Sequence, residues 1–189
     1  MEDIMQKLVD VPLLICDFDG TLAKLRMDWN LLKSRLGKLA RKKGISWQEN
    51  ERIDDNLRKI RVEYGESIFS MFCNYIAREE MLSFDPDLIC KSLYSVLHRR
   101  KGRPYAIVSS NTRQAIEKIF LHPIWNGLQP YIVGKEDVYY GKPDPEGLIK
   151  VCNHFGFSSQ QAIYIGNTWI DHCAASAIGI TFIHIKSIQ

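Results

Sequence analysis

Apolar residues near the start of the chain form one short run, residues 11–16, that ends abruptly in the acidic segment Asp17–Thr21. The length and composition of this run predict a strand that is buried on both faces, as in a parallel sheet. Beyond this segment the pattern becomes helical and stays so as far as residue 101. Apolar stripes and capping signals there predict four helices, which begin near Asp28, Ser46, Glu66 and Asp85.

From residue 104 onward, short apolar strands alternate with helical segments. The predicted strands cover residues 105–108, 131–133, 162–165 and 180–185, and the predicted helices cover 112–121, 145–155 and 169–178. This alternation is typical of βαβ units, so we expect an α/β protein with a parallel sheet. We expect residues 1–23 and 102–189 to form its core domain, with the helical insert 24–101 as a second domain.

Composition narrows the class of protein. The 189 residues are 46% hydrophobic and 25% charged, as in a globular protein with one core and a small accessory domain. The apolar runs are too short to span a bilayer and the N-terminus lacks a signal-peptide pattern, so we expect a cytoplasmic protein without a membrane partner. The net charge of +3 comes without a nucleic-acid motif, so we expect no nucleic-acid partner either.

Two carboxylates, Asp17 and Asp19, follow the first strand directly. Ligands bind at the carboxyl ends of strands in open α/β sheets, and Gly20 lets the backbone turn sharply there. Two acids this close repel each other unless a cation or a shared proton relieves them. The segment therefore indicates either a catalytic or metal-binding pair or a strand that ends in an ordinary Asx turn.

The pattern Asp17-x-Asp19-x-Thr21 resembles the first motif of the haloacid dehalogenase-like (HAD) phosphohydrolases. The resemblance implies a Rossmann-like core with an all-helical cap, and the insert 24–101 matches that cap in position. It implies that Asp17 attacks phosphorus and that Asp19 serves as acid and base. It also places Gly20 and Thr21 at the bound substrate.

Two further segments resemble the second and third motifs of this family. Ser109 follows the predicted strand 105–108 in the place of the hydroxyl that holds phosphoryl oxygens, and Ser110 and Asn111 are neighbouring donors. Small polar residues between a strand and a helix are also good helix caps. Lys142, in a Gly-Lys-Pro-x-Pro segment, takes the place of the lysine that neutralises the nucleophile and the phosphoryl group.

The fourth motif departs from the family pattern. Residues 163–171 resemble a strand followed by Gly-Asp-Thr-x-x-Asp, but Asn167 stands where the family has a metal-binding acid, and Asp171 keeps the second acidic place. Magnesium prefers hard oxygen ligands that include carboxylate charge. The resemblance assigns the metal to Asp17, Asp19, Asn167 and Asp171, and the missing charge predicts weaker metal binding.

Together the motifs imply a magnesium-dependent phosphatase that hydrolyses a small phosphorylated metabolite through an aspartyl-phosphate. Its catalytic residues would be Asp17, Asp19, Ser109 and Lys142. A phosphomutase is a variant within this class, and Asp19 argues against a dehalogenase. The alternative is a catalytically weakened HAD-like protein that binds a phosphorylated ligand or a protein partner, and Asn167 is the residue that motivates it.

Arg26 lies just beyond the nucleophile strand. It is a candidate contact for a substrate anion, and an exposed arginine beside a helix start is the other interpretation. The sequence leaves the substrate open, and we expect either a monomer or a homodimer.

Overall fold

The computed structural model describes residues 2–100 and 102–188, so Met1, Lys101 and Gln189, at limits of the predicted domains, lie outside the described residues. The strands are β1 (Leu13–Cys16), β2 (Ala23–Leu25), β3 (Phe84–Ile89), β4 (Tyr105–Val108), β5 (Tyr131–Val133), β6 (Ala162–Gly166) and β7 (Thr181–His184). The helices are α1 (Glu2–Asp10), α2 (Trp29–Lys42), α3 (Ile53–Leu82), α4 (Lys91–Arg99), α5 (Arg113–Ile119), α6 (Glu146–Phe155) and α7 (Trp169–Ala177).

Five parallel strands form the central sheet, in the order β5-β4-β1-β6-β7. β1 lies in the middle, where Ile15 is in register with Ala106 of β4 and with Tyr164 of β6. All four residues of β1 are buried, which explains why this strand is apolar throughout. The predicted α/β fold is confirmed, and the carboxyl ends of β1, β4 and β6 meet at one edge of the sheet.

Helices cover both faces of the sheet. On one face, Leu14 of β1 belongs to a buried cluster with residues of α1, α4 and α5, such as Leu93. On the other face, Ile15 packs in a cluster with α6 and α7, which includes Leu148. No helix in the described part of the chain combines the length and the apolar composition needed to cross a membrane.

Helix α1 was not predicted from the sequence, and a buried arginine holds it in place. The Arg100 guanidinium donates to five backbone carbonyls at 2.6–3.3 Å, those of Leu8, Val9, Val11, Pro12 and Pro104. Carbonyls at the end of a helix lack intrahelical donors, so they are natural acceptors for this side chain. Burial lowers the pKa of Arg100 to about 10, which leaves it charged at neutral pH.

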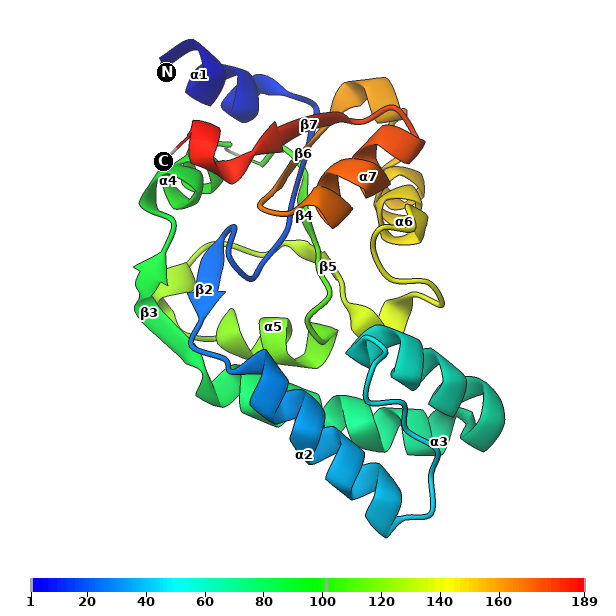
Figure 1. Ribbon diagram of the computed structural model, residues 1–189. Helices are drawn as coiled ribbons and strands as arrows, with labels where there is room; N and C mark the ends of the chain where they lie inside the picture. The colour runs from blue at the N-terminus through cyan, green and yellow to red at the C-terminus, as the bar shows by residue number, and fades with distance from the viewer. Residues whose placement is uncertain (1, 101, 189) are drawn as a thin grey trace.

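Two helices, α2 and α3, form a separate layer with its own apolar core, in which Leu36 packs near Ile60 and Phe72. Asp28 begins α2, since its Oδ1 accepts from Leu31 N at 2.9 Å. α3 is kinked at Gly65, where φ is 81°, and the break predicted there between two helices coincides with the kink. Both helices lie at the end of the molecule away from the chain termini (Figure 1).

The start predicted for the second helix, at Ser46, is wrong, because residues 46–52 form a connection without helical structure. Asn56 holds Gln48 by accepting from its backbone N at 2.7 Å and donating to its O at 3.0 Å. Trp47 stacks on Phe72 with ring centroids 6.1 Å apart. These tertiary contacts override the local capping pattern, and α3 begins only at Ile53.

The start predicted for the fourth helix, at Asp85, is also wrong, because β3 occupies this segment and pairs antiparallel with β2; the helix itself is present as α4 and begins at Lys91. The ribbon is extended by Arg26 N, which donates to Ser83 O at 2.8 Å, and by Cys90 N, which donates to Leu22 O at 2.9 Å. Pro86 is tolerated because this two-stranded ribbon has an irregular register and leaves an edge unpaired.

The two strands of the ribbon connect α2 and α3 to the rest of the chain, and α4 packs on the sheet beside α1. We therefore propose a cap made of α2 and α3 alone, instead of all of residues 24–101.

Candidate active site

Three motif residues lie at the carboxyl ends of neighbouring strands, as the parallel topology requires. Asp17 follows β1, Ser109 follows β4 and Asn167 follows β6. With Lys142 they line a cavity of about 360 Å³ between the core and the cap. The structure thus brings together residues that are far apart in the sequence, at the edge where α/β enzymes bind ligands.

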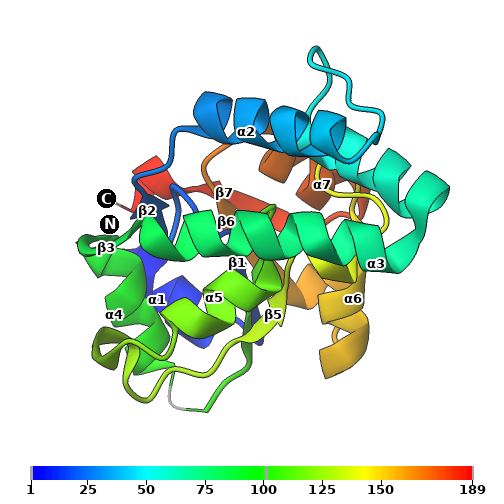
Figure 2. The ribbon, with the colours of Figure 1, turned by 90° about the horizontal axis from the view of Figure 1, so that it is seen from below.

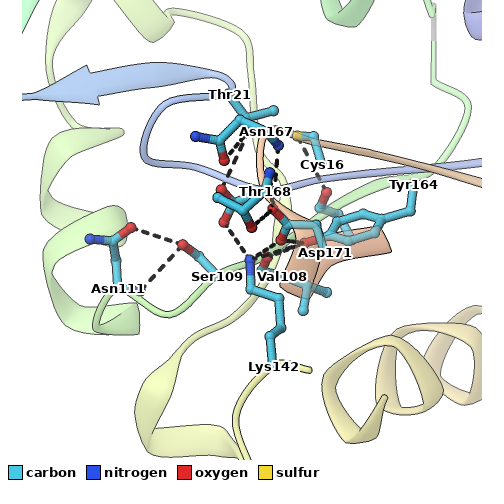
Figure 3. Close-up of polar contacts among 12 residues, drawn as sticks. Cys16, Thr21, Val108, Ser109, Asn111, Lys142, Tyr164, Asn167, Thr168 and Asp171 are labelled. Carbon is cyan, nitrogen blue, oxygen red and sulfur yellow. Dashed lines mark hydrogen bonds and ion pairs between the residues drawn. The ribbon is translucent and has the colours of Figure 1, made fainter. Parts of the chain in front are cut away.

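Lys142 lies between two buried carboxylates, those of Asp17 and Asp171. Its Nζ lies 2.8 Å from Asp17 Oδ1, 2.5 Å from Asp171 Oδ1 and 3.1 Å from Tyr164 Oη (Figure 3). Burial would lower the pKa of Lys142, but the two carboxylates outweigh it and raise that pKa. The side chain is therefore an ammonium that neutralises negative charge beside Asp17.

Asp17 is 5% exposed, so ligands reach it only from the cavity. Its Oδ2 lies 3.4 Å from the hydroxyl of Thr21, and its backbone N donates to Ile165 O at 2.8 Å. Burial raises the pKa of Asp17, and the Lys142 ammonium opposes that rise. One carboxylate oxygen is thus fixed by the lysine while the other remains close to the cavity.

Asp19 lies in the turn that follows, and its Oδ1 accepts from Leu25 N at 2.8 Å. Burial raises the pKa of Asp19, the Leu25 hydrogen bond lowers it, and the nearby Asp17 charge raises it again. A raised pKa favours the protonated acid that a leaving oxygen needs. Gly20 has φ +79°, and a Cβ there would lie 2.3 Å from Asn167 Nδ2, so only glycine fits this turn.

Asn167 faces the first motif through Thr21, whose hydroxyl lies 3.3 Å from Asn167 Oδ1. This hydroxyl is therefore shared between the Asn167 amide and the Asp17 carboxylate. Among residues 2–100 and 102–188, no group of three His, Cys, Asp or Glu side chains is placed to hold a metal. A cation here would depend on one carboxylate together with amide and carbonyl oxygens, a hard-oxygen set that still suits magnesium.

Asp171 does not line the cavity and is fully buried behind Lys142. Its Oδ1 accepts from Lys142 and from Tyr164 at 2.8 Å, and its Oδ2 accepts from Thr168 N at 3.0 Å. Burial alone would raise the pKa of Asp171, but Lys142 lowers it. Since both oxygens are engaged, we assign Asp171 to orienting Lys142 in place of the expected metal ligation.

Tyr164 was missed in the sequence. Its hydroxyl is buried between Lys142, Asp171 and the carbonyl of Val108, 3.2 Å away. A tyrosine in an otherwise aliphatic strand that is buried on both faces was the available signal, since a buried hydroxyl requires polar partners.

The second motif supplies hydroxyls to the cavity. Ser109 Oγ donates to Asn111 Oδ1 at 2.8 Å. Ser110 Oγ is buried and has no hydrogen-bond partner within the described ranges. Both serines line the cavity. A buried hydroxyl without a partner is costly, so Ser110 is well placed to bind an oxygen of a ligand.

The cap completes the cavity with two cations. Lys33 of α2 and Arg52, which precedes α3, line it on the cap side. Arg52 Nη2 also donates to Lys142 O at 3.1 Å. Arg26 is absent from the lining, because its exposed guanidinium pairs with Asp85 at 2.6 Å on the ribbon. The structure therefore does not bring Arg26 to the site.

Direct contacts hold the cap against the core. Asp54 of α3 pairs with Lys135, in the 3₁₀ helix η2 (Lys135–Asp137). Arg61 Nη1 donates to Val138 O at 3.2 Å. The structure is thus a closed arrangement in which the cap covers Asp17.

A parallel sheet with charged groups at the carboxyl end of its central strand places the protein among the α/β enzymes. The model of the haloacid dehalogenase-like hydrolase family matches residues 14–185, and the chain belongs to that family. No curated protein is significantly similar to it in sequence.

Solved structures share the fold at low sequence identity. A protein named as a haloacid dehalogenase-like hydrolase from Bacteroides fragilis is 21% identical with a TM-score of 0.61, covering 92% of this chain and 86% of the other. One named as a phosphoglycolate phosphatase from Haemophilus somnus is 19% identical with a TM-score of 0.60, covering 92% and 84%. CbbY from Rhodobacter sphaeroides, in complex with phosphate, is 15% identical with a TM-score of 0.61, covering 92% and 85%.

Proposed function

We propose that the protein is a magnesium-dependent phosphatase that hydrolyses a small phosphorylated metabolite. The placement of Asp17 carries this proposal. Its carboxylate is held by Lys142 at 2.8 Å and faces a cavity that is also lined by Asp19, Ser109 and Ser110. Names given to proteins of the same fold, phosphoglycolate phosphatase among them, agree with this reaction class.

The proposed reaction gives each of these groups a role. Asp17 attacks phosphorus, the bond from phosphorus to the ester oxygen breaks, and Asp19 gives its proton to that oxygen. Asp19 then takes a proton from the water that hydrolyses the aspartyl-phosphate. Lys142 and Ser109 stabilise the phosphoryl oxygens during both steps.

Magnesium fits the oxygen donors beside Asp17. The Asp17 carboxylate, the Asp19 carbonyl and the Asn167 amide oxygen would hold it, and water would complete the ligand set. When bound, the ion supplies positive charge that offsets the negative charges of the carboxylate and the phosphoryl group.

The cap side of the cavity favours a substrate with a second negative group. The Lys142 and Lys135 ammoniums are paired with carboxylates, whereas Lys33 makes no ion pair among the described residues. Lys33 is half-buried and faces the cavity beside Arg52. Arg52 pairs with Asp54 at 3.2 Å, so a carboxylate or a second phosphate on the substrate would pair first with Lys33.

A panel of phosphate esters tests the proposal. Esters with and without a second anionic group are incubated with the protein at several magnesium concentrations, and released phosphate is measured. We expect magnesium-dependent release, fastest for an ester with a second anion. Absence of release from every ester at every magnesium concentration would contradict the proposal.

A further inference from the structure

Glu80 is a fully buried carboxylate on the cap helix α3, and the chemistry proposed above does not use it. It faces the N-terminus of α5, which lies alongside α3 (Figure 2). Glu80 Oε2 accepts from Thr112 N at 3.0 Å and from Thr112 Oγ1 at 2.5 Å. A residue of the cap is therefore hydrogen-bonded directly to the loop that carries the second motif.

The same carboxylate reaches Ser109 through one intervening side chain. Glu80 Oε1 accepts from Asn111 Nδ2 at 2.9 Å, and Asn111 Oδ1 accepts from Ser109 Oγ at 2.8 Å (Figure 3 shows the second contact). An ionised carboxylate can only accept, so it requires the NH₂ group of Asn111 to face Glu80 and the oxygen to face Ser109. The hydroxyl proton of Ser109 is then directed to Asn111.

We propose that Glu80 is a positioning residue whose protonation decides whether the Ser109 hydroxyl donates to Asn111 or to a bound phosphoryl group. A protonated Glu80 donates to Asn111 Oδ1, so the amide turns over and its NH₂ group donates to Ser109 Oγ. The Ser109 proton is then free for a phosphoryl oxygen. One proton is taken up from solvent and no covalent bond between heavy atoms changes. The inference rests on the proposed role of Ser109 in binding phosphoryl groups.

The surroundings of Glu80 allow both protonation states near neutral pH. Burial raises the pKa of Glu80 to about 7, against the hydrogen bonds from Thr112 and Asn111 and the charge of Lys135. Lys135 is the cation that faces Glu80 from η2, and Asp54 holds its ammonium.

The other ionisable groups near Glu80 form hydrogen bonds or ion pairs with other residues, or are neutral. Glu136 of η2 accepts from Arg113 N at 2.6 Å. From α2, Arg35 pairs with Glu79 at 2.7 Å. Cys73, on α3 itself, stays a neutral thiol because burial raises its pKa to about 12.

The test uses sulfate, because it resembles a phosphoryl group and its charge does not change between pH 6 and pH 8. Calorimetry in the presence of magnesium gives its affinity for the wild type and for Glu80→Gln. The oxygen of the introduced amide must accept from Thr112, so its NH₂ group faces Asn111 and mimics protonated Glu80 at every pH. The ratio of the sulfate affinity of the wild type to that of Glu80→Gln should fall about fivefold from pH 6 to pH 8. The wild type loses one hydrogen bond to the anion over this range, whereas the variant keeps it.

Two further variants make the result specific. Glu79→Gln removes the same charge from the neighbouring position of α3, and it should keep the wild-type pH dependence. Asn111→Ala breaks the link to Ser109 and leaves both Thr112 bonds to Glu80, so it should behave as Glu80→Gln does. This second route to the same state keeps the test decisive if Glu80→Gln does not fold.

Parallel pH dependences in the wild type and in a folded Glu80→Gln or Asn111→Ala variant would overturn the inference. Sulfate binding requires no turnover, so this result is separate from the fate of the proposed function. Ester hydrolysis together with parallel sulfate profiles would refute the role of Glu80 alone. The expected sulfate profiles without any ester hydrolysis would support that role and refute the phosphatase.

Discussion

Three aspartates around the cavity have the same chemistry and different surroundings. Asp17 faces the cavity with one oxygen held by Lys142, and Asp19 has a pKa raised by burial. Asp171 is enclosed behind Lys142, which lowers its pKa. In the proposed reaction, these environments would separate a nucleophile, an acid and a group that orients the lysine, as they do when two carboxylates share one active site.

At the scale of single residues, the amide of Asn167 gives a first prediction. Asn167→Asp adds a carboxylate next to the oxygens of Asp17, so magnesium should bind at least about tenfold more tightly. A charge pair near 4 Å contributes up to about 4 kcal/mol at an effective dielectric of 20, which leaves ample margin for that change. The measurement is calorimetric titration with magnesium at constant ionic strength.

Asn30→Asp is the matched control for this change. Asn30 lines the cap side of the same cavity, so its substitution adds the same charge away from the proposed metal site. Equal magnesium affinities of the wild type and Asn167→Asp would show that position 167 does not face the metal.

Glu80 gives a prediction about stability as well. Its pKa is about 7 in the folded protein against an ordinary value of 4.5, so folding favours the protonated form. The corresponding stabilisation, about 3 kcal/mol, is fully present below pH 4.5 and is lost as the pH rises through 7. Between pH 5 and pH 8, the free energy of unfolding should therefore fall more steeply in the wild type than in Glu80→Gln.

Urea unfolding at both pH values measures this difference. Glu79→Gln, on the surface of the same helix, should follow the wild type. A Glu80→Gln protein with the wild-type slope would show that Glu80 does not titrate in this range.

At the scale of elements, local patterns predicted the strands of the sheet and the helices that follow them. They failed where distant contacts decide the structure. Trp47 and Asn56 hold a connection where a capping pattern favoured a helix. β3 forms because β2, about sixty residues earlier in the chain, offers it a partner. Such pairing leaves no signal in the segment itself.

Lys33 faces the cavity from helix α2, so we expect this helix to contribute to substrate preference. Lys33→Gln should lower the preference for phosphoglycolate over ethyl phosphate about tenfold in kcat/KM, since these esters differ chiefly in a carboxylate. The expected loss equals about 1.4 kcal/mol, close to the lower end of the range for a hydrogen bond to a charged group. Steady-state kinetics with both esters give the ratio.

Lys38→Gln provides the control on the same helix, because Lys38 is exposed and absent from the cavity lining. It removes the same charge and should leave the ratio unchanged. An unchanged ratio in Lys33→Gln would mean that Lys33 does not contact the distal group of the substrate.

At the scale of the whole molecule, the motifs predicted which residues meet at the sheet edge, because parallel strands all end there. Motif spacing did not reveal Tyr164 or Glu80, since both act through side chains from other elements. Nor did it reveal that Asp171 is sealed from the cavity. These features depend on contacts between elements that are distant in the sequence, which no single segment specifies.

In the proposed reaction, a cap over Asp17 would exclude water, which would protect the phosphoryl intermediate and strengthen the interactions between charges around it. The contacts of Asp54, Arg61 and Glu80 with the core all come from the single helix α3. Movement of this helix would therefore open the cavity and release the second-motif loop together.

The central claim is that Asp17 attacks phosphorus, and hydrolysis of a responsive ester by the wild type and by Asp17→Asn tests it most directly. The substitution preserves the volume of the side chain and removes the nucleophile. With magnesium present, we predict that the wild type releases phosphate and that the variant, shown by circular dichroism to be folded, loses at least about a thousandfold in kcat. A folded Asp17→Asn protein that hydrolyses the ester at the wild-type rate would contradict the claim.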